Sequence, residues 1–277
     1  MEIKLVRQIK AFEHFLAVQE KSKGTIGKYT RDVKAFVLWL GDREIDKKHT
    51  VDWKEHLISS GYAAVTINSM ISSLNSFLRF SGREDCQLKF LRIQRKMFRP
   101  ESRELNKNEY FRLVHAAQNE ERIALLLETL CSTGVRVSEI KYITVEAALA
   151  QITEISMKGK IRTIVLPEKL CRKLLRYAAE NNISHGEIFL TKNGKSLNRK
   201  QIWQAMKKLC DQAEVDETKV FPHNLRHLFA RTYYSQYHDI IRLANVMGHS
   251  SAETTRLYLK TSSLENARQL DTLGLVS

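Results

Sequence analysis

The sequence predicts a mainly α-helical protein with one small antiparallel sheet, divided into two domains. Apolar residues recur at helical spacing along most of the 277-residue chain. Only residues 152–166 alternate apolar and polar side chains, on both sides of a Lys-Gly-Lys turn centred on Gly159, as a β-hairpin does. A basic stretch around Pro100 separates the two helical regions. We therefore expect a helical domain at residues 1–90, a basic interdomain linker at 91–104 and a second domain at 105–277.

The first domain is expected to hold four amphipathic helices joined by short polar turns. In the first helix, apolar side chains recur at about 3.6 residues, which places them on one face: Leu5, Ile9, Phe12, Leu16 and Val18. Glycines are common helix terminators, and they punctuate the later helices. The four helices are predicted at residues 2–19, 25–42, 50–61 and 63–82, the third with Thr50 as its N-cap.

The second domain is expected to be helical except for the hairpin and one short extended segment. The apolar helix at residues 121–134 is the best candidate for a core element. Gly134 then makes a turn, and helical periodicity resumes after it. The other helices are predicted at residues 105–118, 135–151, 167–182, 198–215 and from 222 onward, with the extended segment at 187–197.

Composition points to a polyanionic partner. The formal net charge is +14 and the sequence pI is about 9.6, and an excess of Lys and Arg on this scale favours nucleic acid, although a soluble basic protein remains an alternative. The four cysteines are far apart and show no C-x-x-C spacing, which is typical of reduced thiols. The sequence shows no apolar leader and no membrane-length apolar run. We expect a cytoplasmic protein without a membrane segment.

The linker is the most concentrated basic segment. A basic segment between two domains is suited to lying across a duplex and contacting phosphates. The alternative interpretation of this segment is a solvated loop. The candidate DNA-binding side chains here are Lys89, just before the linker, and Arg92, Arg95, Lys96 and Arg99 within it, where Arg103 adds a further basic residue.

Residues 222–230, PHNLRHLFA, combine a helix start with three cationic side chains. Pro222 suits a first helical turn, and His223, Arg226 and His227 then share one side of the helix. An imidazole and a guanidinium aimed the same way are suited to holding a phosphate. The alternatives are a core histidine with a structural ion pair, and a zinc site from the His-x-x-x-His spacing.

Two further stretches carry similar candidates. In TGVRVSEI, Arg136 begins a helix after Gly134, and Glu139 is placed to orient it; a plain capping arrangement is the alternative. In MGHSSAETTRLY, Ser250 and Glu253 fit a capping box, and Tyr258 follows His249 by nine residues. Taken alone, a tyrosine at helical spacing such as Tyr258 is more typical of an ordinary packing residue.

Together these stretches resemble the tyrosine recombinase (phage integrase) family. TGVRVSEI, the hairpin with Lys158, HNLRH and MGHSSAETTRLY occur in the order and rough spacing of that family, over about residues 103–277. The N-terminal helices are similar to the family's SAM-like core-binding domain. The resemblance implies a compact Xer-like member, without an additional arm-type DNA-binding domain, that cuts and rejoins DNA at specific sites for a mobile element or chromosome resolution. A type IB topoisomerase and a catalytically silent DNA-binding relative are the alternatives.

The resemblance also implies a role for each site residue. Tyr258 would attack a DNA phosphodiester and form a 3′-phosphotyrosyl link, while Arg136 and Arg226 hold the non-bridging oxygens. His223 would assist proton transfer from the tyrosine, His249 would support the phosphate, and Glu139 would orient Arg136. Lys158 would protonate the leaving 5′-oxygen, with Lys160 as a competing assignment.

This chemistry is expected to need no metal, ATP or other cofactor. Tyrosine phenols have pKa values of about 10 in model peptides and need cationic help to ionise. Phosphoryl transfer depends mainly on positioning and charge stabilisation, which arginine, lysine and histidine supply. The resemblance implies four protomers holding two double-stranded DNA sites through a Holliday junction. The apolar tail at residues 264–277 would dock on a neighbouring subunit or on its own domain.

Overall fold

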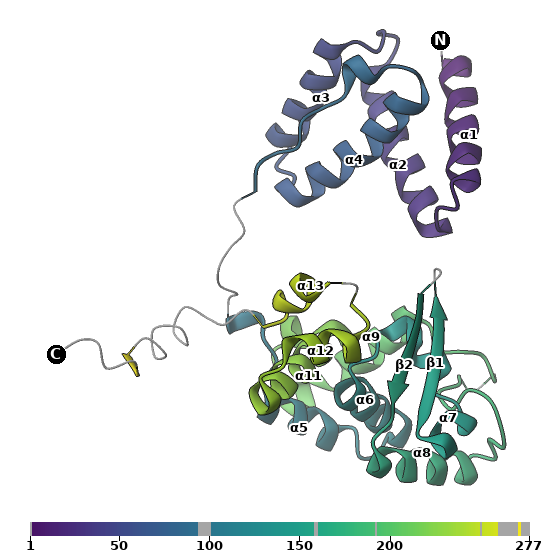
Figure 1. The fold of residues 1–277 in the computed structure, drawn as a ribbon, viewed down its shortest axis with the longest axis vertical. Helices are drawn as coiled ribbons and strands as arrows, with labels where there is room; N and C mark the ends of the chain where they lie inside the picture. Colours follow the sequence, from purple (N-terminus) through teal and green to yellow (C-terminus); the bar gives the residue numbers. More distant parts are fainter. Residues whose placement is uncertain are drawn as a thin grey trace. The chain divides into compact units, whose positions relative to one another are not determined.

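The computed structural model describes residues 2–93, 101–157, 160–191, 193–249, 251–259 and 271–272, for a few of these the backbone only. The chain divides into two compact units, Met1–Arg95 and Lys96–Ser277. Both are built mainly of helices, and the second contains a two-stranded antiparallel sheet (Figure 1). The predicted fold class is therefore confirmed. Among the helices that the structure describes, none has the length and apolar character that a membrane crossing requires.

Four helices make up the first unit, and their apolar faces meet in one core. The helices are α1 (Glu2–Val18), α2 (Lys23–Leu40), α3 (Lys47–Ser59) and α4 (Ala64–Phe80), followed by the short 3₁₀ helix η1 (Glu84–Cys86). Side chains spaced three or four apart on α1, such as Phe12 and Leu16, are fully buried, as the helical period predicts. Val18, predicted on the same face, is 65% exposed because it lies at the last residue of α1.

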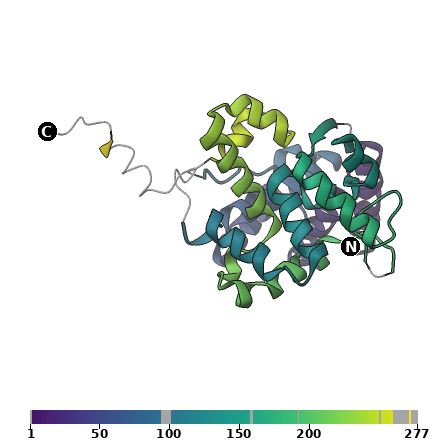
Figure 2. The ribbon, with the colours of Figure 1, turned by 90° about the horizontal axis from the view of Figure 1, so that it is seen from below.

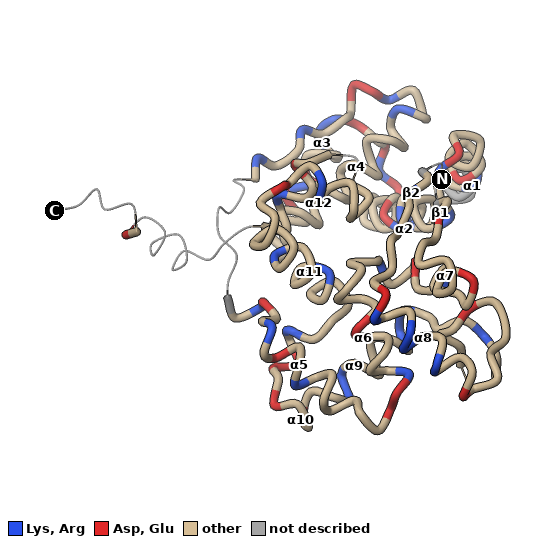
Figure 3. Tube along the Cα trace, turned by 60° about the horizontal axis from the view of Figure 1, so that its bottom comes forward, with Lys and Arg blue, Asp and Glu red and all other residues tan. Residues whose placement is uncertain are grey.

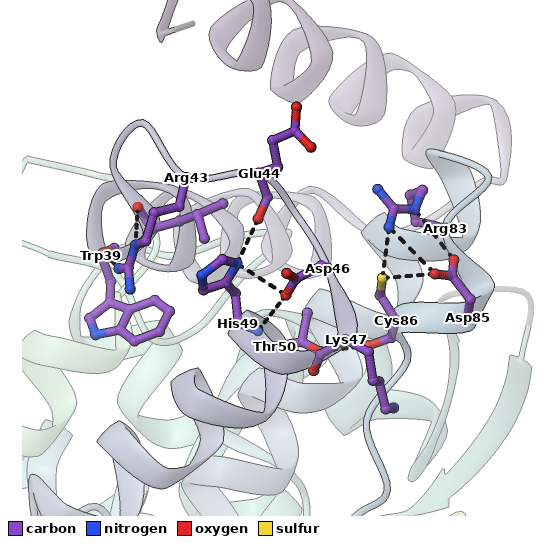
Figure 4. Close-up of polar contacts among 11 residues, drawn as sticks. Trp39, Arg43, Glu44, Asp46, Lys47, His49, Thr50, Arg83, Asp85 and Cys86 are labelled. Atoms are coloured by element: carbon purple, nitrogen blue, oxygen red, sulfur yellow. Dashed lines mark hydrogen bonds and ion pairs between the residues drawn. The ribbon is translucent and has the colours of Figure 1, made fainter.

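The start of α3 differs from the prediction. Its N-cap is Asp46, whose carboxylate accepts a 2.6 Å hydrogen bond from the backbone N–H of His49 (Figure 4). Thr50 is instead fully buried one turn into the helix, where its hydroxyl donates to the carbonyls of Lys47 and Cys86, each at 2.9 Å. The threonine thus fastens the segment after α4 to α3.

Two asparagines of α4 hold that segment in an extended conformation. Asn75 accepts from the backbone N–H of Leu88 at 2.8 Å and donates to its carbonyl at 2.9 Å, and Asn68 does the same with Leu91. Each amide side chain makes the pair of backbone hydrogen bonds that a neighbouring β-strand would otherwise make. We call residues 87–92 the strap; Leu88 faces the core, while Lys89 and Arg92 are exposed.

The second unit contains the remaining elements. Its helices are α5 (Lys107–Ala116), α6 (Glu121–Thr133), α7 (Val145–Ala150), α8 (Glu168–Glu180), α9 (Arg199–Lys208), α10 (Cys210–Ala213), α11 (Pro222–Tyr237), α12 (Ile240–Met247) and α13 (Ala252–Arg256). Its 3₁₀ helices are η2 (Glu101–Arg103), η3 (Val137–Tyr142) and η4 (Glu217–Lys219), and its strands are β1 (Ile152–Met157) and β2 (Lys160–Val165). Helices α11 to α13 lie together in both ribbon views (Figures 1 and 2).

Helix α6 is the central core element, as its apolar sequence predicts, and it packs against α8 and α11. Gly134 ends it in the left-handed conformation, at φ +62°. A Cβ at Gly134 would lie 2.4 Å from a ring carbon of Phe229 on α11. Only glycine therefore allows both this turn and the close approach of α11.

The hairpin pairs β1 with β2 from Ile152↔Val165 to Met157↔Lys160. This register agrees with the predicted turn, whose residues 158–159 lie outside the described part. Along β2 the exposed and buried positions alternate, so Arg162 and buried Ile164 share the inner face. The extended segment predicted at 187–197 forms only isolated bridges in its described residues, Thr144↔Glu187 and Leu190↔Ser196.

Helix α11 also fastens the far end of the linker to the second unit. The buried side chain of Asn224 donates to the carbonyls of Arg103 and Lys219 at 2.8 and 2.7 Å. Arg231 forms an ion pair with Glu104 and donates to the carbonyl of Leu105 at 2.8 Å. The helix that carries His223 and Arg226 is therefore the one that holds this end of the linker.

Candidate active site

Helix α11 carries three side chains of the predicted site. Pro222 occupies its first turn, as expected, and His223, Arg226 and His227 follow on one side. The two imidazoles meet edge to face, with ring centroids 4.6 Å apart. Within the described residues, no three or more His, Cys, Asp or Glu side chains are grouped where they could hold a metal ion. Both imidazoles contact the ring of Tyr258.

Arg226 is the buried centre of this group, at 2% exposure. Its guanidinium donates to the carbonyls of Gly134 and Met247 and, at 3.0 Å, to Nε2 of His249. Burial, and secondarily the charge of Arg136, lowers the pKa of Arg226 to about 10. Arg226 thus remains a cation at neutral pH and is fixed between two backbone turns.

Tyr258 lies among the cationic and imidazole side chains. Its ring stacks on His227 with centroids 4.2 Å apart, and it meets His223 at 5.3 Å and His249 at 5.1 Å. The guanidinium carbon of Arg226 lies 5.9 Å from the centre of the same ring. Helix α13 and the turn before it bring the tyrosine here from a stretch of sequence far from Gly134 and Arg136.

Arg136 and Glu139 form a second part of the site, at the start of η3. The predicted helix here is a 3₁₀ helix with Arg136 at its N-cap. Glu139, 3% exposed, accepts from the backbone N–H of Arg136 at 2.7 Å and from its guanidinium at 3.0 Å. The Arg136 side chain itself is 42% exposed. A buried carboxylate therefore holds the side chain of an accessible cation.

His249 is held in one tautomer. Because arginine can only donate, Nε2 accepts from Arg226, and Nδ1–H must donate to the buried hydroxyl of Thr255 at 2.8 Å. Burial, and then the charges of Arg226 and Arg136, lower the pKa of His249 to about 4. The α13 N-cap is Ser251, which accepts from Glu253 N–H at 3.1 Å, rather than the predicted Ser250, which lies outside the described residues.

A pocket of about 720 Å³ opens beside these residues. Arg136, His223, Arg226 and Tyr258 line it together with apolar residues of the Gly134 turn and the α11 start. Three side chains of α9 also line it, and the sequence reasoning missed them: Arg199, Lys200 and Trp203. The signal was present, since two cations and an indole on one helical face are typical of a nucleic-acid contact. Lys and Arg occur over the elements of both units, so overall charge did not single α9 out (Figure 3).

Arg162 is a second residue that sequence reasoning missed. Its side chain is 9% exposed, its Nη1 donates to the carbonyl of Met247, and its Nη2 lies 3.5 Å from Glu139. Burial lowers its pKa, which Glu139 opposes. The available signal was its position on the inner face of β2, where the alternation requires an apolar residue.

The remaining predicted site residues are described in part. Lys158 lies outside the described residues, and of Lys160 only the strand backbone is described. Lys89, just before the linker, and Arg92 within it are exposed on the strap. Arg95, Lys96, Arg99 and the apolar tail, apart from residues 271–272, fall outside the described part.

Comparison with known proteins identifies the class that this fold and site define. Residues 103–265 match the model of the phage integrase family, and residues 9–85 match its N-terminal SAM-like domain. The chain belongs to the phage integrase family, and it is a Xer-like site-specific tyrosine recombinase. Relatives include tyrosine recombinase XerA of Thermococcus kodakarensis, 28% identical over 264 residues, covering 92% of this chain and 90% of the relative. XerD of Staphylococcus epidermidis is 28% identical over 287 residues, with 92% and 94% covered.

Solved structures share the fold. A lambda integrase tetramer bound to a Holliday junction superimposes with a TM-score of 0.73 at 18% identity, over 92% of this chain and 76% of that one. The Tn1549 transposon integrase in complex with transposon right end DNA gives a TM-score of 0.70 at 15% identity, over 98% and 99%. The comparisons thus give no support to the topoisomerase alternative.

Proposed function

We propose that this recombinase cuts and rejoins double-stranded DNA at specific sites, with Tyr258 as nucleophile. The observation that carries the proposal is the position of the Tyr258 ring, between three imidazoles and the buried Arg226, in the pocket that Arg136 also lines. A phenol poised among cations and next to a pocket is suited to attack an anionic phosphodiester.

The bond changes balance without an external energy source. The Tyr258 oxygen forms a bond to phosphorus as the bond from phosphorus to the 5′-oxygen breaks, leaving a 3′-phosphotyrosyl link and a 5′-hydroxyl. The phenolic proton passes toward His223, and a proton from Lys158, or from Lys160, reaches the departing oxygen. Because one phosphate ester replaces another, attack by a 5′-hydroxyl of the partner duplex reverses the step without ATP.

Charge stabilisation is assigned to the two arginines. Arg136, held by Glu139 and exposed toward the pocket, and Arg226 would bind the non-bridging oxygens as charge develops on them. Both ring nitrogens of His249 are used within the protein, one by Arg226. We therefore assign His249 first to holding Arg226 toward the phosphate.

The remaining parts of the proposal concern DNA and assembly. The first unit, with Lys89 and Arg92 exposed on the strap, would act as a clamp joined by the linker at residues 91–104 to the catalytic domain, with Arg95, Lys96 and Arg99 as further phosphate contacts. Structures of lambda integrase as a dimer on a core site and as a tetramer on a Holliday junction support a homotetramer here. Docking of the tail on a neighbour would make a heterologous, ring-closing contact. We place the protein in the cytoplasm, serving a mobile element or chromosome resolution.

A covalent trapping experiment tests the nucleophile. A binding site is first selected from a randomised duplex library, then supplied with a nick beside the cleavage position so that religation is lost. Wild type is expected to form a protein–DNA adduct that withstands denaturation, and Tyr258→Phe is expected to form none. Tyr237→Phe, which alters an exposed tyrosine of α11, is the matched control and should form the adduct. An adduct with Tyr258→Phe, or none with wild type, refutes the proposal.

A plasmid assay separates recombination from the alternatives. Plasmids with two selected sites are expected to give recombinant products, whereas supercoiled plasmids without such a site should remain supercoiled. Relaxation of the site-free plasmid would favour a topoisomerase. DNA binding without any adduct would favour a silent relative.

A further inference from the structure

Arg162 is a buried cation to which the proposed reaction assigns no role. It lies on β2, facing inward with Ile164, and its side chain is 9% exposed. Within the described residues, its Nε and Nη2 atoms are buried and make no hydrogen bond. Burying a guanidinium costs free energy unless nearby groups compensate it. Packing alone therefore does not account for a guanidinium buried at this position.

Those contacts reach both halves of the phosphate site. Nη2 lies 3.5 Å from Glu139, the carboxylate that holds Arg136. Nη1 donates to the carbonyl of Met247, which also accepts from Arg226 at 2.6 Å. Arg162 thus shares one carbonyl with Arg226 and one carboxylate with Arg136.

Gly248 shows how closely the arginine stem is packed. A Cβ added at Gly248 would lie 2.3 Å from Cδ of Arg162 and 3.0 Å from its Nη1. Gly248 ends α12 at φ +61°, and His249 follows directly. The turn that presents His249 therefore packs directly against the Arg162 side chain, with no room for a larger residue at position 248.

We infer that Arg162 is a positioning residue that ties the hairpin to the phosphate-binding arginines. Through Glu139 it sets Arg136, and through the Met247–Gly248 turn it sets Arg226 and His249. Among the described side chains, its polar contacts are with Met247 and Glu139 and not with the proposed nucleophile Tyr258. The inference rests on the proposed function, because its effect is exerted through residues assigned there.

The test compares single-turnover cleavage by wild type, Arg162→Met and the matched control Arg172→Met on the nicked duplex. Arg172 is a 70% exposed arginine of α8. Loss of positioning is expected to slow cleavage by Arg162→Met about 100-fold, since displacements near 1 Å have effects of this size. Arg172→Met should cleave like wild type, and all three proteins should bind the duplex with equal affinity.

A second substrate distinguishes positioning from a general structural defect. A methylphosphonate at the cleavage position lacks one non-bridging negative charge, so precise placement of the arginines matters less. The defect of Arg162→Met is expected to shrink by about tenfold or more on this substrate. An equal defect on both substrates, or a wild-type rate on the natural phosphate, overturns the inference.

Folding is checked by circular dichroism, and Arg162→Lys takes the place of Arg162→Met if the latter is unfolded. The lysine keeps the charge but loses the second donor, so a smaller defect with the same dependence on substrate is expected; a defect independent of substrate overturns the inference here too. Failure of the wild type to form an adduct would refute the proposed function, whereas wild-type cleavage with an unaffected Arg162 variant refutes only the positioning role.

Discussion

Lowering the pH is expected to destabilise the catalytic unit through His249. Its folded-state pKa is about 4, below the ordinary 6.5, because burial and the neighbouring arginines disfavour the imidazolium. Between these values the unfolded chain binds a proton at this position and the folded protein does not. The contribution of neutral His249 is therefore complete above about pH 6.5 and is lost as the pH falls toward 4.

The size of the effect follows from the shift. A displacement of the pKa from 6.5 to about 4 corresponds to at most about 3–4 kcal/mol, at about 1.4 kcal/mol for each unit. The ring is only partly buried, so solvent screening reduces this contribution to the free energy of unfolding, to about 1–2 kcal/mol. Protonation of Nε2 breaks the hydrogen bond from Arg226 and leaves the one from Nδ1–H to Thr255 in place.

Native-state hydrogen exchange in urea tests this prediction between pH 7 and 4. Exchange of the α11 and α12 peptides reports the unfolding free energy of the catalytic unit separately from that of the first unit. Wild type should lose more stability over this range than His249→Gln, which has no imidazole to protonate. Replacing the exposed His115 by Gln should leave the wild-type slope unchanged. Parallel profiles for wild type and His249→Gln would show that His249 is not held neutral.

Four further substitutions test the fold. Gly134→Ala should destabilise the catalytic unit by about 1–3 kcal/mol in thermal unfolding, because its Cβ would meet Phe229 at 2.4 Å and φ is +62°, whereas Gly27→Ala, in open space on α2, should stabilise the first unit by about 0.5–1 kcal/mol. Asn75→Ala should raise amide hydrogen exchange in the strap, because it removes both hydrogen bonds between Asn75 and Leu88. Unchanged exchange would show that Asn75 does not hold the strap to α4. Asp46→Ala should cost about 1 kcal/mol in urea unfolding as α3 loses its cap.

Helices and the hairpin were predictable because their periodicity is local. The α1 and α6 apolar faces and the β2 alternation are readable within a dozen residues. Most of their inward-facing apolar side chains are buried, whereas Val18 at the end of α1 and Ile161 and Val165 on the outer face of β2 are exposed. Caps were less predictable, since Asp46 and Thr50 are both suitable by residue type. The choice depends on Thr50 meeting the carbonyl of Cys86 across the core, which no local pattern contains.

The candidate site was predictable where short motifs carry it. Arg136, His223, Arg226, His249 and Tyr258 stand in recognisable stretches, and the structure brings them together. Arg162 was missed because its role depends on the meeting of β2, η3 and the α12 turn, three segments distant in sequence. Likewise, the contribution of α9 to the pocket is a property of tertiary packing.

The hydrogen bonds from Asn68 and Asn75 to the strap shorten the segment that joins the two units. Asn68 and Asn75 fix the chain to α4 as far as Leu91, and Asn224 holds it to α11 from Arg103. Twelve peptide units, from Leu91 to Arg103, then set an upper limit of about 40 Å on the separation of the two anchored residues. Once one unit has bound a duplex, a tether of this length presents the other at an effective concentration on the order of millimolar. Weak contacts by each unit would thereby combine into firm binding of a single site.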